Sequence, residues 1–165
     1  MAAEQGSEAQ LRGFAEAGDD DEVRNTFLMH AEKTGAQYQR LARKLEALGG
    51  RPSEEKSFFA DLFGTIAKAP QAAGVQEEQT TQNLIAAATV ESGKCALYEA
   101  LATVAAIAGE PDIERLAREI QAEERQTAER LYRFLPSRSK IAFNVLTPHE
   151  IDPAIETKAP DDRAI

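Results

Sequence analysis

The hydrophobic positions of this chain recur with helical spacing, most clearly over residues 23–48. Apolar and small residues there alternate at intervals of four and three, which places them on one stripe of a long amphipathic helix. Three aspartates at 19–21 supply an N-cap and negative charge where this helix would begin, and a Gly-Gly-Arg-Pro run at 49–52 indicates its end. The stretch therefore predicts a long helix with well-defined ends.

Three more helices are predicted, and no strand pattern competes with them. A short helix runs from almost the first residue to Gly18, and a long one covers about 76–108. Another begins at Pro111, a residue suited to the first turn of a helix, and we expect it to end at Pro136. Four amphipathic helices of this kind predict an all-α four-helix bundle.

The connection between the second and third predicted helices is long and contains an apolar segment. Ser53 and the two glutamates after it predict the start of a short helix within this crossover, which Pro70 closes. A long connection allows the next helix to return parallel to the previous one. The apolar face of the crossover segment consists of Phe58, Phe59, Leu62, Phe63 and Ile66.

The sequence changes character after residue 135. Prolines at 148, 153 and 160 and scattered charges predict an extended tail over 136–165, attached to a bundle that covers 1–135. We expect the tail to lie on the bundle or on a protein partner. Its apolar anchors are Ile141, Phe143, Val145 and Leu146.

Composition and charge exclude several classes of function. The 165 residues suffice for one domain, and a net charge of -9 without an evident basic patch argues against nucleic acid as a partner. One cysteine excludes an intramolecular disulfide and a cysteine-rich zinc site, and two histidines leave little for an imidazole-based metal centre. No apolar stretch is long enough to cross a membrane, and the opening residues do not resemble a signal peptide, so a cytoplasmic protein without membrane contact is expected.

Glutamates on the apolar stripes of three different helices are the most informative feature. Glu4, Glu91 and Glu124 each lie on such a stripe, and burying an unpaired carboxylate costs several kcal/mol. In helix bundles, converging carboxylates build dimetal sites. The alternatives are that these side chains reach water at a helix end or pair with interior cations.

Several short motifs, in order along the chain, resemble the YciE/YciF type of stress protein, a ferritin-like family. The resemblance covers residues 3–135 and implies a ferritin-like four-helix bundle, a homodimer and a role in stress responses. The matching positions are Ala3, Glu4, Asp19 to Glu22, Phe27, His30, Thr34, Arg40, Leu41, Leu84, Ile85, Val90, Glu91, Tyr98, Glu123, Glu124 and Leu131.

This chain departs from that family at the positions that the resemblance assigns to metal ligands. The family's carboxylates fall on Glu4, Lys33, Glu91, Lys94 and Glu124, so two of the five are lysines. Glu32 lies about 100° around the helix from position 33 and is a poor substitute. Further family positions are occupied by Gln37, Ser92 and Ala128.

The charge balance of this set favours salt bridges over metal. Three carboxylates and two lysines need little further neutralisation, and an ammonium group beside Glu91 and Glu124 would repel an incoming cation. We therefore expect a remnant of a metal site and no cofactor. If Lys33 and Lys94 instead extend outward to solvent, the three glutamates could hold one weakly bound ion of iron or manganese.

Other candidate side chains have structural interpretations. His30 is expected to pack or hydrogen-bond rather than to bind metal, and Cys95 to be a small core residue. Tyr38 and Tyr98 are expected to fill the core and offer hydroxyls to the carboxylates, and His149 receives no role.

Three functions follow from these observations. The first is a ferritin-like, stress-associated protein that acts by association, as a homodimer or through a protein partner of its tail. The second is an iron- or manganese-dependent oxidase, peroxidase or ferroxidase that uses Glu4, Glu91 and Glu124, with Glu32 as a further candidate ligand. The third is a metal-independent enzyme in which burial makes Lys94 or Lys33 a neutral amine, which the neighbouring glutamates oppose.

Overall fold

The computed structural model describes the backbone of residues 2–18, 20–50 and 75–147, and their side chains from Ser7 onward. Four helices make up these residues, which contain no strand: α1 (Ala2–Ala17), α2 (Asp21–Ala47), α4 (Gln76–Ala108) and α5 (Pro111–Leu146). This confirms the all-α prediction. The expected short crossover helix, and the part of the expected tail at 148–165 with His149, lie outside the described residues.

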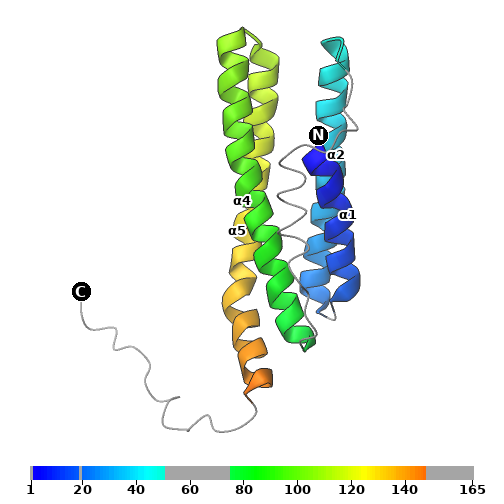
Figure 1. Ribbon diagram of the computed structural model, residues 1–165, viewed down its shortest axis with the longest axis vertical. Coiled ribbons are helices and arrows are strands. Elements are labelled where there is room, and N and C mark those ends of the chain that lie inside the picture. Colours follow the sequence, from blue (N-terminus) through cyan, green and yellow to red (C-terminus); the bar gives the residue numbers. More distant parts are fainter. Residues whose placement is uncertain (1, 19, 51–74, 148–165) are drawn as a thin grey trace, which may run out of the picture.

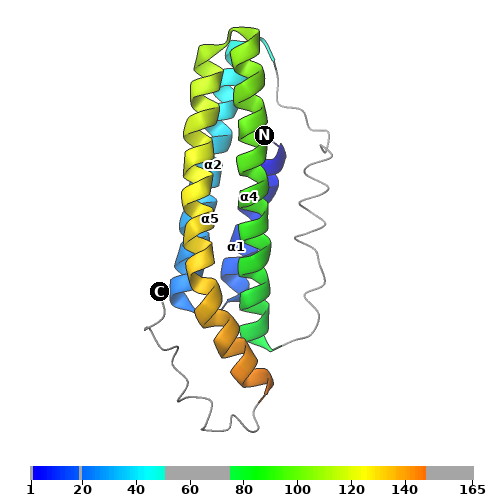
Figure 2. The ribbon, with the colours of Figure 1, turned by 90° about the vertical axis from the view of Figure 1, so that its left-hand side faces the viewer.

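The helices form two antiparallel pairs that pack side by side (Figures 1 and 2). α1 packs mainly on α2 and α4 mainly on α5, while α2 touches α5 and α1 touches α4 between the pairs. The colours in Figure 1 show that α2 and α4 run in the same direction. This is the parallel return that the long connection predicted.

Local sequence signals set most helix ends. The Asp20 carboxylate accepts hydrogen bonds from the backbone N–H groups of Glu22 and Val23, both at 3.0 Å, which satisfies donors that an α-helix leaves open at its start. α4 ends at Ala108, and the next residue, Gly109, has a left-handed φ of 75°, which favours glycine. Pro111 occupies the first turn of α5, as predicted.

The predicted end of the last helix at Pro136 is wrong, because α5 continues to Leu146. Proline removes one backbone hydrogen bond and crowds the preceding turn, so the neighbouring contacts must compensate. Ala142 is buried, and Arg138 forms an ion pair at 2.6 Å with Asp20, the N-cap residue of α2. These tertiary contacts hold residues 136–146 in a helix where the sequence predicted an extended tail.

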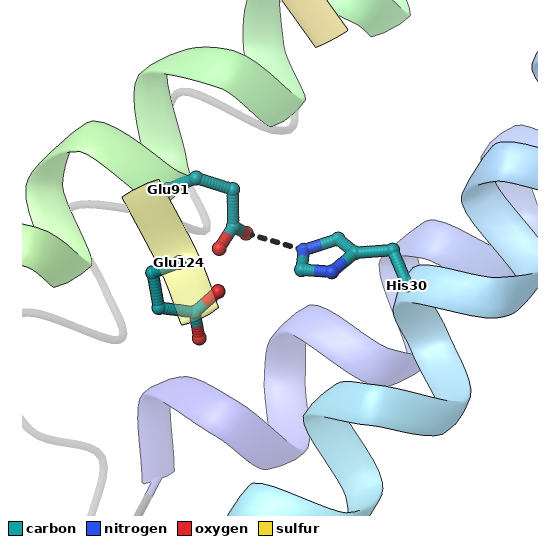
Figure 3. Close-up of side chains that lie close together, drawn as sticks. All are labelled: His30, Glu91 and Glu124. Atoms are coloured by element: carbon teal, nitrogen blue, oxygen red, sulfur yellow. Dashed lines mark ion pairs between the residues drawn. The ribbon is translucent and has the colours of Figure 1, made fainter. Parts of the chain in front are cut away.

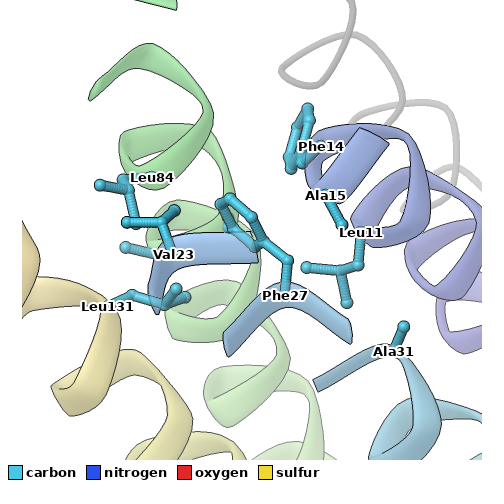
Figure 4. Close-up of a cluster of buried hydrophobic side chains, with 10 residues drawn as sticks. Leu11, Phe14, Ala15, Val23, Phe27, Ala31, Leu84 and Leu131 are labelled. Carbon is cyan, nitrogen blue, oxygen red and sulfur yellow. The ribbon is translucent and has the colours of Figure 1, made fainter. Parts of the chain in front are cut away.

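Two apolar clusters make up the core. The larger cluster joins all four helices, and its rings of Phe14 and Phe27 lie 5.5 Å apart (Figure 4). The smaller one joins α4 to α5 through Tyr98, Ala102, Ala117 and Ile120. No described helix is both long and apolar enough to span a membrane. The larger cluster comprises Leu11, Phe14, Ala15, Val23, Phe27, Ala31, Leu84, Ala87, Ala88 and Leu131.

Candidate functional site

Ionisable side chains from three helices meet between the two apolar clusters. His30 of α2, Glu91 and Lys94 of α4 and Glu124 of α5 are 3%, 1%, 1% and 0% exposed. Figure 3 shows His30, Glu91 and Glu124 converging from their three helices. Helical spacing places them there, because Glu91 and Lys94 lie between Ala88 and Tyr98 on the buried stripe of α4, and Glu124 lies four residues after Ile120. We call these four residues the ionic layer.

Each carboxylate of the ionic layer contacts a nitrogen that is or can become positively charged. His30 Nε2 lies 2.9 Å from Glu91 Oε1, and Lys94 Nζ lies 3.4 Å from Glu91 Oε2. Lys94 Nζ also lies 3.2 Å from Glu124 Oε1. The lysine ammonium therefore joins two buried carboxylates on neighbouring helices, which offsets part of the cost of removing them from water.

The second lysine of the predicted set lies outside the ionic layer. Lys33 is half-buried, and its ammonium donates to the backbone carbonyl oxygen of Glu123 at 3.1 Å. Glu32 is exposed, as expected from its place on the helix. Glu4 belongs to α1, but its side chain lies outside the described part of the chain. The structure thus brings together Glu91, Lys94 and Glu124 of the five predicted residues.

The residues at the remaining family positions do not complete a ring of metal ligands. The Gln37 amide donates to Glu123 Oε2 at 2.9 Å, and the Ser92 hydroxyl donates to the backbone carbonyl of Ala88. Ala128 is a buried core residue. None of these three side chains offers a carboxylate or an imidazole to an ion.

A second polar network, which the sequence did not single out as a site, ties α2 to α5 beside the ionic layer. Arg40 forms ion pairs with Glu123 at 2.8 Å and Glu119 at 2.7 Å. Partial burial by itself would raise the pKa of Glu123, but hydrogen bonds from Gln37 and Arg40 outweigh it and hold that pKa below its ordinary value. The i, i+4 spacing of Glu119 and Glu123 is the signal that could have indicated this network.

Four side chains for which the sequence predicted structural roles lie among the described residues. His30 makes the expected polar contact, and that contact places it within the ionic layer. Cys95 is half-buried, and burial, followed by the charge of Glu124, raises the pKa of its thiol. A protonated thiol is a poor nucleophile, which agrees with a core role. Tyr98 fills the smaller apolar cluster as predicted, whereas Tyr38 is only half-buried.

The ionic layer has some, but not all, of the features of a metal-binding site. His30, Glu91 and Glu124 each offer a ligand atom, and these atoms lie within 4.8 Å of one another. However, the Lys94 ammonium lies against both carboxylates, at 3.2 and 3.4 Å, where a cation would have to bind. Three described donors and an ammonium group do not fit a dimetal site, which needs more oxygen and nitrogen ligands and no competing positive charge.

Comparison with known protein families identifies the family of this chain. Residues 1–143 match the family model described as a domain of unknown function, DUF892. The chain belongs to this family. Membership of DUF892 and the likeness in fold to YciF given below confirm the resemblance to the YciE/YciF type of protein. Comparison with curated proteins gives no match.

Solved structures with the same fold include three bacterial proteins. YcfI from Rhodopseudomonas palustris is 23% identical with a TM-score of 0.72, over 79% of this chain and 83% of its own. A protein from Xanthomonas campestris is 21% identical with a TM-score of 0.71, over 88% of each chain. The Escherichia coli stress protein YciF is 21% identical with a TM-score of 0.63, over 90% of each chain. At these identities the likeness establishes the fold of this DUF892 member.

Proposed function

We propose that this DUF892 member is a stress-associated, ferritin-like protein that works by association and has no functional dimetal centre. Interior ion pairs then take the place of metal ions. The observation that carries the proposal is Lys94, whose ammonium contacts the carboxylates of Glu91 and Glu124. A cation entering this layer must displace a positive charge that already neutralises its ligands. The stress role rests on the likeness to YciF.

Exposed apolar side chains support a function in association. On α4, Val104 is 62% exposed and Ile107 is 83% exposed, and both lie toward the end of the helix where it turns into α5. Exposed apolar residues also end α5, at Phe143, Val145 and Leu146. Clusters of exposed apolar side chains are typical of interaction sites. A homodimer or a protein partner is the proposed use of these surfaces, in the cytoplasm.

One observation favours a second candidate, an iron- or manganese-dependent oxidoreductase. The imidazole of His30 and the carboxylates of Glu91 and Glu124 lie close enough together to bind one ion. For that to happen, the Lys94 side chain must leave both carboxylates. The two candidates therefore differ in whether the native chain retains metal with its lysine in place. A neutral lysine acting as a catalytic amine has less support, since two carboxylates favour its charged form.

Metal analysis with matched variants tests the proposal. The wild-type protein is produced without a histidine tag in metal-supplemented cells, purified without chelator and then loaded anaerobically with ferrous iron. We expect near-zero iron and manganese in the wild type and in Lys33→Glu, and bound cation in Lys94→Glu. One or two ions per wild-type chain would contradict the proposal.

A second readout covers the case in which Lys94→Glu does not fold without metal. Three carboxylates in a buried layer repel one another, so added manganese should raise the melting temperature of Lys94→Glu and leave that of Lys33→Glu unchanged. Equal responses of the two variants would mean that Lys94 does not exclude the ion.

A further inference from the structure

An apolar cleft lies beside the ionic layer, between α2, α4 and α5. Its volume is about 310 Å³, at the lower end of the range of small-molecule sites, roughly 300 to 1,000 Å³. None of its described lining residues belongs to α1, and Figure 1 shows that α1 stops short of the end of the bundle where α2 ends. Apolar side chains of the three helices form most of the lining, among them Leu41, Leu45, Leu97, Leu101, Ile113 and Leu116.

The two charged side chains that line this cleft, beside the phenol of Tyr98, are both lysines, and they differ in their surroundings. Lys94 closes the inner end, where its ammonium is already held by two carboxylates. Lys44 has a partly exposed side chain and forms an ion pair with Asp112 at 2.8 Å. A ligand in the cleft therefore meets hydrocarbon along most of its length and positive charge on the solvent side.

A basic cluster adjoins the cleft on that side. Arg40, Arg43, Lys44 and Arg115 line a neighbouring surface hollow together with Asp112 and Glu119, and Lys44 and Leu116 line both the hollow and the cleft. Four cationic and two anionic side chains make this hollow positive, although the chain as a whole has a net charge of -9. The sequence did not indicate such a patch, because its members come from two helices.

Arg43 is the member of the cluster that is best placed to receive an anion. Arg40, Lys44 and Arg115 form ion pairs with Glu119, Glu123 or Asp112. Arg43 is exposed and forms no ion pair with another described residue. A guanidinium group presents several donors to a carboxylate in a fixed planar arrangement.

We propose that the cleft binds a straight-chain anionic amphiphile, a fatty-acid-like carboxylate, with its chain among the leucines and its headgroup at Arg43 and Lys44. The apolar lining matches the chain, and the basic cluster at the mouth matches the carboxylate. The two Lys94 ion pairs stay intact, so this binding does not depend on whether the ionic layer holds metal.

Titration calorimetry of the full chain with octanoate, decanoate and dodecanoate, each below its micelle concentration, tests the proposal. Each buried CH2 contributes about 0.8 kcal/mol, so affinity should rise about fifteenfold for each two carbons until the cleft is full. One ligand should bind per chain, and decyltrimethylammonium should bind at least tenfold more weakly than decanoate. Equal binding of the two headgroups, or no dependence on chain length, would overturn the proposal.

Matched variants locate the site. Leu97→Trp fills the cleft and should abolish decanoate binding, whereas Ile85→Trp, at an exposed position of the same helix, should preserve it. Arg43→Gln should weaken binding up to about fivefold, and the exposed Arg130→Gln should have no effect. Unchanged binding in Leu97→Trp, with circular dichroism matching the wild type, would overturn the proposal.

Two other occupants of the cleft give distinct results. If binding appears only after Phe58, Phe59 and Phe63 are replaced by serine, the crossover fills the cleft and the proposal fails. If the apparent affinity for decanoate falls as the protein concentration rises, a second copy of the chain covers the cleft, and the proposal fails as well. Binding to vesicles of anionic lipid but not to free decanoate would assign the basic cluster to a membrane surface and would also overturn it.

Discussion

Arg138 of α5 forms an ion pair with the N-cap residue of α2, since its Nη2 lies 2.6 Å from Asp20 Oδ2. The other oxygen of the same carboxylate accepts the two capping hydrogen bonds from Glu22 and Val23. The Asp20 side chain thus caps the start of α2 and also forms an ion pair with the last turns of α5. Both groups are about 20% exposed, which places this pair between a surface and an interior salt bridge.

Substitutions of Asp20 should separate its two roles. Asp20→Ala removes both the cap and the ion pair and should lower the free energy of unfolding by about 1 to 2 kcal/mol. Asp20→Asn keeps a capping oxygen and should lose less than half of that amount. Urea denaturation measures both, and Asp21→Asn, exposed one residue later, is the control. An equal loss in Asp20→Ala and Asp20→Asn would mean that the ion pair and not the cap matters.

Removal of the buried ammonium should be strongly destabilising. Lys94→Met leaves the carboxylates of Glu91 and Glu124 without their lysine, and we expect a loss of about 3 to 5 kcal/mol in the free energy of unfolding. The exposed Lys140→Met should change it by less than about 0.5 kcal/mol. Adding Glu124→Gln to Lys94→Met should restore part of the loss, because one buried charge disappears.

This experiment also tests whether the lysine extends to solvent instead. A loss below about 1 kcal/mol in Lys94→Met would show that its ammonium does not neutralise the interior carboxylates. Glu91→Ala provides the reciprocal test, and it should also cost about 3 to 5 kcal/mol because it removes the shared partner of His30 and Lys94.

The lowered pKa of Glu123 predicts a loss of stability in acid. Its carboxyl group has a lower pKa in the folded than in the unfolded chain, so its contribution is complete above the unfolded value, near 4.5, and is lost as pH falls through the folded value. Because this side chain is 30% exposed, screening limits the contribution to about 1 kcal/mol. Glu123→Gln should therefore be less stable than the wild type at pH 7.

The same pair of proteins, unfolded in urea at pH 7 and at about pH 3, measures the effect of Glu123. The difference between wild type and Glu123→Gln should shrink toward the lower pH. The exposed Glu129→Gln on the same helix should show no such convergence. A difference that stays constant with pH would assign the effect of the substitution to lost hydrogen-bond geometry rather than to charge.

Replacement of the proline within α5 should stabilise the protein. Pro136 is exposed, and Pro136→Ala restores one backbone N–H donor and removes the steric conflict with the preceding turn, which is worth up to about 3 kcal/mol. Urea denaturation measures the change. If the variant is instead less stable, the local geometry at the proline is needed to bring Arg138 to Asp20, and adding Arg138→Gln should then cost nothing further.

The sequence predicted the four helices because each signal is local. Alternating intervals of three and four, the aspartates before α2 and the glycine after α4 act within one helix, and the structure agrees with all three. Pro136 is the exception, since the contacts that carry α5 past it come from α2. A local breaker signal cannot report a stabilising partner that is distant in sequence.

The candidate site was predictable in part for the same reason. Glu91, Lys94 and Glu124 lie on apolar stripes, so their burial follows from helical spacing. Two other features depend on how α2 is rotated against α4 and α5. Lys33 points toward the backbone of Glu123, and His30 contacts Glu91. The apolar cleft and its basic cluster likewise join side chains from separate helices.

Because the ionic layer lies between two apolar clusters, it restricts how far the helices can slide past one another along the bundle axis. A slide of α5 against α4 by one turn, about 5.4 Å, would move Glu124 from Lys94 into purely apolar surroundings. Leucine and alanine contacts alone tolerate such slippage, because many alignments bury similar hydrocarbon. The four side chains of the ionic layer therefore favour a single alignment of the helices along the bundle axis.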